Sequence, residues 1–254
     1  MNAVELFLRF GKGRARPLSM ITCYDSTFAA IAAQAGVDVL LVGDSLANVM
    51  LGLDRTSGIG MAEMIHHTRA VRRGAPDACV VVDLPFGADT SVADALANSR
   101  ALVASGADAV KLEGCGEAVI AALVADGIAV VGHLGLLPQT ATSLKQVGKT
   151  PEDRAKVLDQ ARRVEASGAC ALVLEHIPAD LGTEITQALS IPTVGIGAGN
   201  GCAGQVLVLH DLLGLSARQP PFAPARVDLR GIVLEALRGY HTDVSEGRFP
   251  PPKA

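Results

Sequence analysis

Short apolar runs alternate with longer amphipathic stretches along most of the chain. The runs are almost continuously hydrophobic, which is typical of strands that are buried on both faces of a parallel sheet. We interpret eight of them as strands, which fall at Ser19–Thr22, Val37–Val42, Cys79–Asp83, Ala109–Leu112, Ala129–Gly132, Ala171–Glu175, Thr193–Ile196 and Val206–Leu209. The pattern therefore predicts a parallel sheet with helices between its strands.

The stretches between the runs carry helix signals. Thr150 and Pro151 provide an N-cap and a first-turn proline. The phrases AGVD, SGAD and SGAC begin at residues 35, 105 and 167, and each places a glycine between a helix and the next strand. This repeated β–α unit predicts an α/β fold, a single (β/α)8 TIM barrel, with an open doubly wound sheet as the structural alternative. The predicted helices span Ser26–Ala35, Ala62–Arg73, Val92–Ser105 and Pro151–Ser167.

Length and composition fit one such barrel. The chain has 254 residues, and a (β/α)8 barrel typically needs ~250. Hydrophobic residues make up 49% and aromatic residues only 3%, so we expect a core of branched aliphatic side chains. We predict a single domain over residues 1–254 in which residues 211–254 are a C-terminal arm. This arm contains a predicted helix at Leu229–Ser245 and packs on the barrel or on a neighbouring subunit.

Several function classes are not expected from this sequence. The net charge of −4 comes without the basic stripe of a nucleic-acid-binding protein. No apolar run approaches the ~18 residues of a membrane span, and the first residues do not resemble a signal peptide. The five cysteines are far apart and never form CxxC, which favours reduced thiols in a cytoplasmic protein.

Polar side chains lie at or just after the ends of five of the predicted strands. In a (β/α)8 barrel the carboxyl ends of all the strands meet at one mouth, where the active site lies. Any one of these residues has a structural explanation as a helix cap, an ion pair or a hydrogen-bonding partner. Together they predict a functional mouth, and in chain order they are Asp44, Ser45, Asp83, Lys111, Glu113, His133 and Glu175.

The charges at this mouth predict a metal ion. Four carboxylates would surround one lysine, and such crowding requires either protonation or a bound cation. Asp44 and Asp83 end neighbouring strands, ~4.8 Å apart, so both reach one ion. Oxygen ligands and open positions favour Mg²⁺, whereas zinc motifs such as HExxH are missing from the sequence. Lys111 and Glu113 point to the same side of their strand, and Glu175 is placed to act as a general base.

Longer sequence blocks resemble a known family. The blocks TCYD (22–25), LVGDSL (41–46), DLPF (83–86), KLEG (111–114), GHLGLLPQ (132–139) and LVLE (172–175) precede a long final block that begins at residue 191. Together they are similar to the ketopantoate hydroxymethyltransferases, also named 3-methyl-2-oxobutanoate hydroxymethyltransferases. The resemblance implies a barrel of the phosphoenolpyruvate/pyruvate superfamily and covers most of the chain.

This resemblance also implies a reaction and its partners. The family transfers a hydroxymethyl group from 5,10-methylenetetrahydrofolate to 3-methyl-2-oxobutanoate through a Mg²⁺-stabilised enolate. The product is 2-dehydropantoate, a precursor in pantothenate biosynthesis. The expected partners are therefore a small 2-oxo acid, a folate and further copies of the chain in a cytoplasmic homo-oligomer, possibly a decamer.

The resemblance also assigns expected roles. Glu175 matches the proposed catalytic base. Asp44 and Asp83 match the Mg²⁺ ligands and also contact the substrate, while Glu113 matches a further metal-site residue that contacts the ion indirectly. The remaining matches are to substrate contacts, and they are Ser45, Lys111 and His133.

The two longest predicted loops, Gly43–Gly60 and His133–Thr150, depart from the family's usual sequence. These departures leave room for a related Mg²⁺-dependent aldol-type transferase or carbon–carbon lyase that takes another donor or acceptor. A non-catalytic barrel that serves only in assembly is a further alternative.

Overall fold

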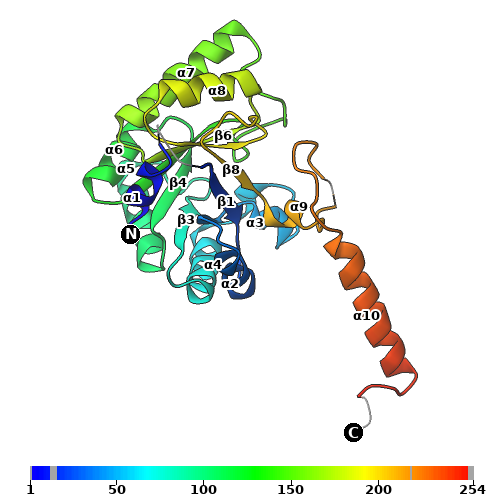
Figure 1. The fold of residues 1–254 in the computed structure, drawn as a ribbon. Coiled ribbons are helices and arrows are strands. Elements are labelled where there is room, and N and C mark those ends of the chain that lie inside the picture. The colour runs from blue at the N-terminus through cyan, green and yellow to red at the C-terminus, as the bar shows by residue number, and fades with distance from the viewer. Residues whose placement is uncertain (1, 12–15, 218, 251–254) are drawn as a thin grey trace. The chain divides into compact units, whose positions relative to one another are not determined.

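The computed structural model describes residues 2–11, 16–217 and 219–250. Eight parallel strands form a closed barrel in which each strand pairs with the next and β8 pairs with β1 (Figure 1). This closure confirms the predicted barrel and excludes an open doubly wound sheet. The strands are β1 Leu18–Thr22, β2 Val39–Val42, β3 Cys79–Asp83, β4 Ala109–Glu113, β5 Ala129–Gly135, β6 Ala171–Glu175, β7 Thr193–Ile196 and β8 Gly204–Leu207.

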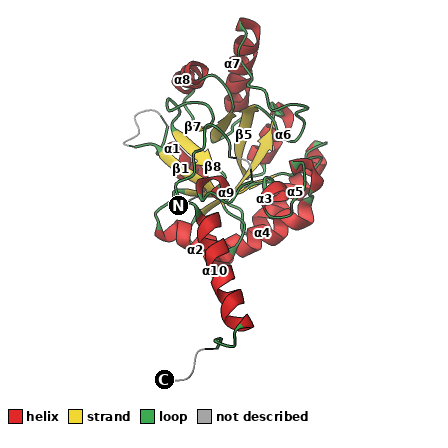
Figure 2. Cartoon of the chain, turned by 90° about the vertical axis from the view of Figure 1, so that its right-hand side faces the viewer, coloured by secondary structure: helices red, strands yellow, loops and turns green. Residues whose placement is uncertain are grey.

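Helices surround the strands on the outside of this barrel (Figure 2). The short helices α3 (Leu46–Val49) and η1 (Thr56–Gly58) lie in the segment after β2. The longer helices are α2 Ser26–Gln34, α4 Met61–Gly74, α5 Val92–Ala104, α6 Glu117–Ala125, α7 Pro151–Ala166 and α8 Ala179–Ala188. Local signals fix where they begin, since the side chains of Asp25 and Ser91 accept hydrogen bonds from the first turns of α2 and α5.

The structure differs from the sequence prediction at several elements. Helices α6 and α8 were not predicted, because the segment EAVIAALVA of α6 lacks a polar face and α8 follows Pro178 without a side-chain cap. Strand β5 continues to Gly135, so His133 lies within the strand and not after it. Strand β8 begins at Gly204, where the close approach of the Leu18 backbone leaves no room for a side chain.

Aliphatic side chains fill the barrel, as the composition predicted. Helix α1 (Ala3–Leu8) adds Phe7, and the turn after it adds Phe10, to a buried cluster with Met20, Val39 and other strand residues. Met20 and Val39 are paired residues of neighbouring strands. The two phenylalanines therefore pack against the inside of the barrel and close part of it to solvent.

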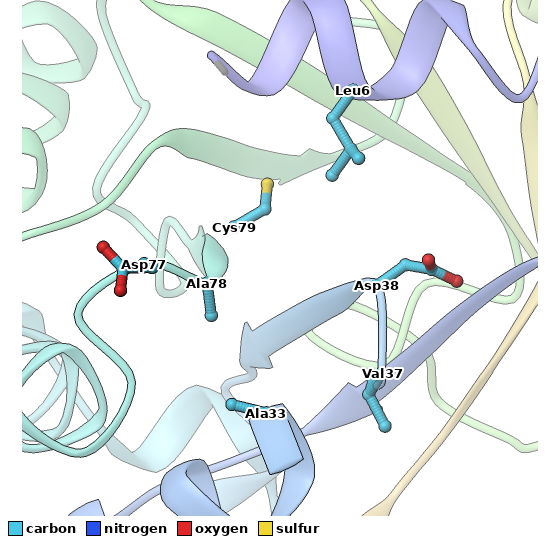
Figure 3. A pocket seen from close by; sticks show the side chains of 7 residues that line it. All are labelled: Leu6, Ala33, Val37, Asp38, Asp77, Ala78 and Cys79. Carbon is cyan, nitrogen blue, oxygen red and sulfur yellow. The ribbon is translucent and has the colours of Figure 1, made fainter. Parts of the chain in front are cut away.

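A cavity of about 410 Å³ lies beside the starts of β2 and β3, at the opposite ends of these strands from Asp44 and Asp83 (Figure 3). Asp38 and Asp77 line it together with Leu6 and Cys79, and their two carboxylates lie at opposite sides of it. Asp38 is already bound to Arg16 and to the Ser19 amide. Polar groups do not converge here, so we regard this cavity as structural.

Residues 209–254 form a second compact unit, separate from residues 1–208. It contains α9 (Leu209–Leu212) and α10 (Leu229–Ser245), and α10 has no buried residues. The helix was predicted over the same residues, whereas the surface on which the arm packs stays a prediction. Nowhere in the described residues does a helix combine the length and apolar character needed to cross a membrane.

The cysteines follow the prediction of unlinked thiols. None of the five cysteines forms a disulfide bond within the part of the chain that the structure describes. Burial raises the pKa of Cys170 to about 12, so this thiol is uncharged at neutral pH.

The packing of α2 on α4 provides a test of this fold. A Cβ atom at Gly74 would collide with the backbone of Ser26. We expect Gly74→Ala to lower the free energy of unfolding by about 1–3 kcal/mol, as measured by urea denaturation. Gly116→Ala is the matched control because its nearest neighbours lie at 3.6 and 3.7 Å, and an equal loss in both variants would contradict the predicted contact.

Candidate active site

The residues predicted from the strand ends line one cavity of about 250 Å³. We call it the inner cavity. Parallel pairing of neighbouring strands brings these residues together. Asp83 on β3 is opposite Lys111 on β4, and Glu113 on β4 is opposite His133 on β5. In the same way, Gly135 at the end of β5 is opposite Glu175 on β6. The predicted residues that line the inner cavity are Asp44, Ser45, Asp83, Lys111, Glu113, His133 and Glu175.

Lys111 occupies the centre of this group and is only 5% exposed. Its Nζ lies 2.9 Å from Asp83 Oδ1 and 3.3 Å from His133 Nδ1. Burial lowers the pKa of Lys111, but the nearby carboxylates of Asp83 and Asp44 outweigh it, and the net shift is upward. The side chain therefore remains a buried cation and can hold an anionic substrate.

His133 connects this cation to Glu175. Burial and the charge of Lys111 lower the pKa of His133, so the ring is neutral near pH 7. Because Nδ1 faces the lysine ammonium, which can only donate, we assign the ring proton to Nε2. Nε2 lies 3.3 Å from Glu175 Oε2, although the contact lacks the angle of a hydrogen bond. The histidine thus separates the cation from the glutamate and faces both.

Two other carboxyl groups are strongly perturbed by their surroundings. Burial, with the negative charge of Asp83, raises the pKa of Asp44 to about 7. Burial also raises the pKa of Glu113 to about 8, against the opposing effect of Lys111. Neighbouring carboxylates add to the effect of burial at both residues, although Lys111 acts against them.

Gln139 was missed as a site residue by the sequence prediction. Its side-chain amide donates to Asp44 Oδ2 at 2.8 Å and to the Leu84 carbonyl at 3.0 Å, and its backbone N–H donates to Glu113 Oε2 at 3.2 Å. It thereby connects the segment after β5 to the Glu113 carboxylate at the end of β4 and to the Asp44 carboxylate just after β2. Its position at the end of the block GHLGLLPQ could have indicated a role in the site, but an uncharged residue in a loop was not considered as a candidate.

Tyr24 was missed in the same way. It is buried, and its hydroxyl lies 2.9 Å from Ser45 Oγ. Burial raises the pKa of Tyr24, so it stays a neutral partner that orients the serine hydroxyl. Its signal was the block TCYD, at the end of β1.

Asp44 and Asp83 could hold a divalent cation. Asp83 Oδ2 accepts the Asp44 backbone N–H at 3.0 Å, so the two residues are adjacent. Asp83 Oδ1 is buried and has no hydrogen bond of normal geometry, although the Lys111 ammonium is close. No group of three or more His, Cys, Asp or Glu side chains in the described residues is arranged to hold a metal. An ion would therefore depend on two aspartates and on oxygens of water or substrate, which fits Mg²⁺.

Comparison with known proteins decides the family. A family model described as ketopantoate hydroxymethyltransferase matches residues 6–252. The chain belongs to the ketopantoate hydroxymethyltransferase family. It is 48% identical over 249 residues to a 3-methyl-2-oxobutanoate hydroxymethyltransferase of Pyrobaculum islandicum, with 96% of this chain and 95% of the relative covered. The enzyme of the same name from a Cyanothece species is 49% identical, with 94% and 95% covered.

Solved structures support the fold of this ketopantoate hydroxymethyltransferase family member. A 2,3-dimethylmalate lyase of the PEP mutase/isocitrate lyase superfamily matches with a TM-score of 0.63 at 15% identity, covering 99% of this chain and 90% of that one. A phosphonopyruvate hydrolase, solved with oxalate and Mg²⁺, matches with a TM-score of 0.67 at 13% identity and covers 97% and 88%. At such identities the likeness shows the barrel alone.

The contacts of Gln139 lead to a prediction about stability. Gln139→Leu removes the donor to Asp44 and to the Leu84 carbonyl, and we expect it to lower the free energy of unfolding by about 1–3 kcal/mol. Gln205→Leu is the control, since the Gln205 amide donates to the Gly199 carbonyl at 2.9 Å from an exposed position. Urea denaturation of both variants measures the difference, and an unchanged stability of Gln139→Leu would show that its hydrogen bonds are dispensable.

Proposed function

We propose that the chain transfers a hydroxymethyl group from 5,10-methylenetetrahydrofolate to 3-methyl-2-oxobutanoate and so forms 2-dehydropantoate for pantothenate biosynthesis. Family membership supports the overall reaction. The observation that carries the mechanism is the series of contacts in the inner cavity from Asp83 to Lys111, from Lys111 to His133, and from His133 to Glu175. We further propose that the protein works in the cytoplasm as a homo-oligomer, as the family resemblance suggests.

The reaction balances without an oxidant or reductant. C3 of the keto acid loses a proton and forms a bond to the methylene carbon of the folate. The two bonds from that carbon to folate nitrogen are broken in turn, and water supplies the hydroxyl group of the product. Tetrahydrofolate is the other product, and its nitrogens take up protons.

The inner cavity suits a small 2-oxo acid. The Lys111 ammonium and the Ser45 hydroxyl are donors for the substrate's carboxylate and oxo oxygens, and Tyr24 holds the serine in place. Fixed donors of this kind stabilise negative charge that develops during the reaction. His133, buried between Lys111 and Glu175, lies beside the position that the reacting carbon would occupy.

Asp44 and Asp83 are the residues that would hold Mg²⁺. Glu113 is linked to Asp44 because both accept hydrogen bonds from Gln139. When bound, Mg²⁺ supplies positive charge beside the oxo group and makes loss of the C3 proton easier. Burial, with the neighbouring carboxylates, raises the pKa values of Asp44 and Glu113 and so makes both costly to ionise, a cost that a bound cation would offset.

Glu175 is the proposed proton acceptor. Its side chain is 20% exposed at the end of β6, so it is partly open to the cavity, unlike the buried Asp83. It lies on the far side of His133 from Lys111. A carboxylate across the cavity from the substrate-holding cation can take the C3 proton while the acid's oxygens stay near Lys111.

Exchange of the C3 proton into D₂O tests this assignment. We expect Glu175→Gln to keep the fold but to slow exchange of 3-methyl-2-oxobutanoate by about 10²-fold or more. Glu184→Gln is the control because Glu184 is exposed on α8 and pairs with Arg154. Exchange measured by NMR at the wild-type rate in Glu175→Gln would reassign the base, and its absence from the wild type would overturn the proposed function.

Metal affinity tests the two aspartates. We expect Asp83→Ala to weaken Mg²⁺ binding by about tenfold or more, as measured by calorimetry. Because this variant leaves the Lys111 ammonium without its partner, Asp83→Asn serves as a second variant of unchanged size. Asp159→Ala, at an exposed position on α7, is the control. Unchanged affinity in both Asp83 variants would place the metal elsewhere.

A further inference from the structure

The backbone of His176, the residue directly after Glu175, has an unusual conformation. Its φ is +47°, and among the residues that the structure describes no other non-glycine residue has a positive φ. A side chain is unfavourable in this left-handed region, although asparagine, aspartate and histidine tolerate it better than other residues. Such strain persists only where the surrounding structure holds it, and it is concentrated at functional sites.

Hydrogen bonds from two other parts of the barrel hold His176. Its N–H donates to the Ile196 carbonyl at the end of β7 at 2.9 Å, and its carbonyl accepts from the Val147 N–H at 3.1 Å. Val147 belongs to the segment between β5 and α7, so the two bonds come from the two sides of β6. Because φ rotates the carbonyl relative to the N–H, a negative φ at this residue would not keep both bonds.

The backbone of Glu175 is held just as closely. Its carbonyl accepts from the Leu136 N–H at 2.8 Å, and a Cβ atom at Gly135 would collide with the same carbonyl. Glu175 therefore packs directly against the end of β5, the strand that carries His133. The peptide group between Glu175 and His176 is thus fixed through its carbonyl by β5 and through its N–H by β7.

The Glu175 carboxylate depends on this backbone for its position. Its Oε2 lies 3.3 Å from His133 Nε2, but the contact lacks the angle of a hydrogen bond. Within the described residues, no hydrogen bond of normal geometry reaches this carboxylate, and the side chain is 20% exposed. A general base must lie within hydrogen-bonding reach of the proton that it takes. The fixed peptide after Glu175 therefore has a consequence for catalysis.

We propose that His176 is a positioning residue for proton removal, because its left-handed backbone holds the Glu175 carboxylate toward C3 of the keto acid. The role lies in the backbone conformation, so a residue that tolerates a positive φ can replace the histidine. The inference rests on the proposed function, since Glu175 needs a fixed position only if it takes a proton.

Substitutions that differ in their tolerance of a positive φ test this proposal. His176→Val introduces a β-branched residue, which strongly disfavours the left-handed region, whereas His176→Asn removes the imidazole but tolerates the region. We would measure kcat and KM for exchange of the C3 proton of 3-methyl-2-oxobutanoate into D₂O by NMR. Gly74→Ala is the control for lost stability, because the contact that it disturbs lies between α2 and α4.

We expect His176→Val to lower kcat by roughly tenfold or more and to leave KM within about twofold, because the Lys111 ammonium and the Ser45 hydroxyl lie outside β6. His176→Asn and Gly74→Ala are expected to keep the wild-type kcat. In the Glu175→Gln background, His176→Val is expected to have no further effect, since the base through which it acts is already removed. If the valine variant does not fold, His176→Ala takes its place, because alanine disfavours a positive φ less strongly.

A wild-type kcat in His176→Val would overturn the inference, as would an equal loss in His176→Asn or a further loss in the double variant. Crystal structures of the two single variants provide a readout that is independent of activity. We expect the Glu175 carboxylate to keep its contact with His133 in His176→Asn and to lose it in His176→Val, and an identical position in both would also overturn the inference. Absence of exchange from the wild type would instead overturn the proposed function, while the crystal structures still decide whether His176 positions Glu175.

Discussion

The buried ammonium of Lys111 constrains the rest of the site. A charge with 5% exposure is stable only if nearby groups compensate for its lost hydration, and Asp83 at 2.9 Å provides this compensation. Neighbouring strands fix the pair, because Asp83 and Lys111 are register partners on β3 and β4. The barrel thus holds a buried positive charge in a fixed position, which is the proposed binding point for the keto acid. Strands β5 and β6 and the segment after β2 place their polar residues around it.

The excess of carboxylates around this cation divides the inner cavity into two sides. Asp44 and Asp83 lie together and are connected to the segment after β5 by Gln139, whereas Glu175 lies beyond His133. Removal of a proton next to a carbonyl requires a cation near the carbonyl oxygen and a base near the proton, and the two sides would provide one each. His133 is neutral and buried, and its ring faces Lys111 through Nδ1 and Glu175 through Nε2.

Much of this arrangement could be predicted from the sequence, for a physical reason. In a parallel barrel every strand ends at the same mouth, so the residues that follow each apolar run must meet there, as Asp83 and Glu175 do. Other features depend on tertiary contacts. Gln139 contacts Asp44 from a segment that is far away in the sequence, and Arg55 contacts Ala141 in the same way. Helix α6 lacks a polar face, so its hydrophobic pattern could not reveal it.

The central claim is that Asp44, Asp83 and Lys111 activate a keto acid whose C3 faces Glu175. Locating the metal ion and the bound acid in a crystal is the most direct test of this claim. Crystals grown with Mn²⁺ in place of Mg²⁺ and soaked with 3-methyl-2-oxobutanoate would locate the ion by its anomalous scattering. We predict a single peak between the carboxylates of Asp44 and Asp83, with C3 of the acid facing Glu175. A peak at any other position, or an acid whose C3 faces away from Glu175, would contradict the proposed mechanism.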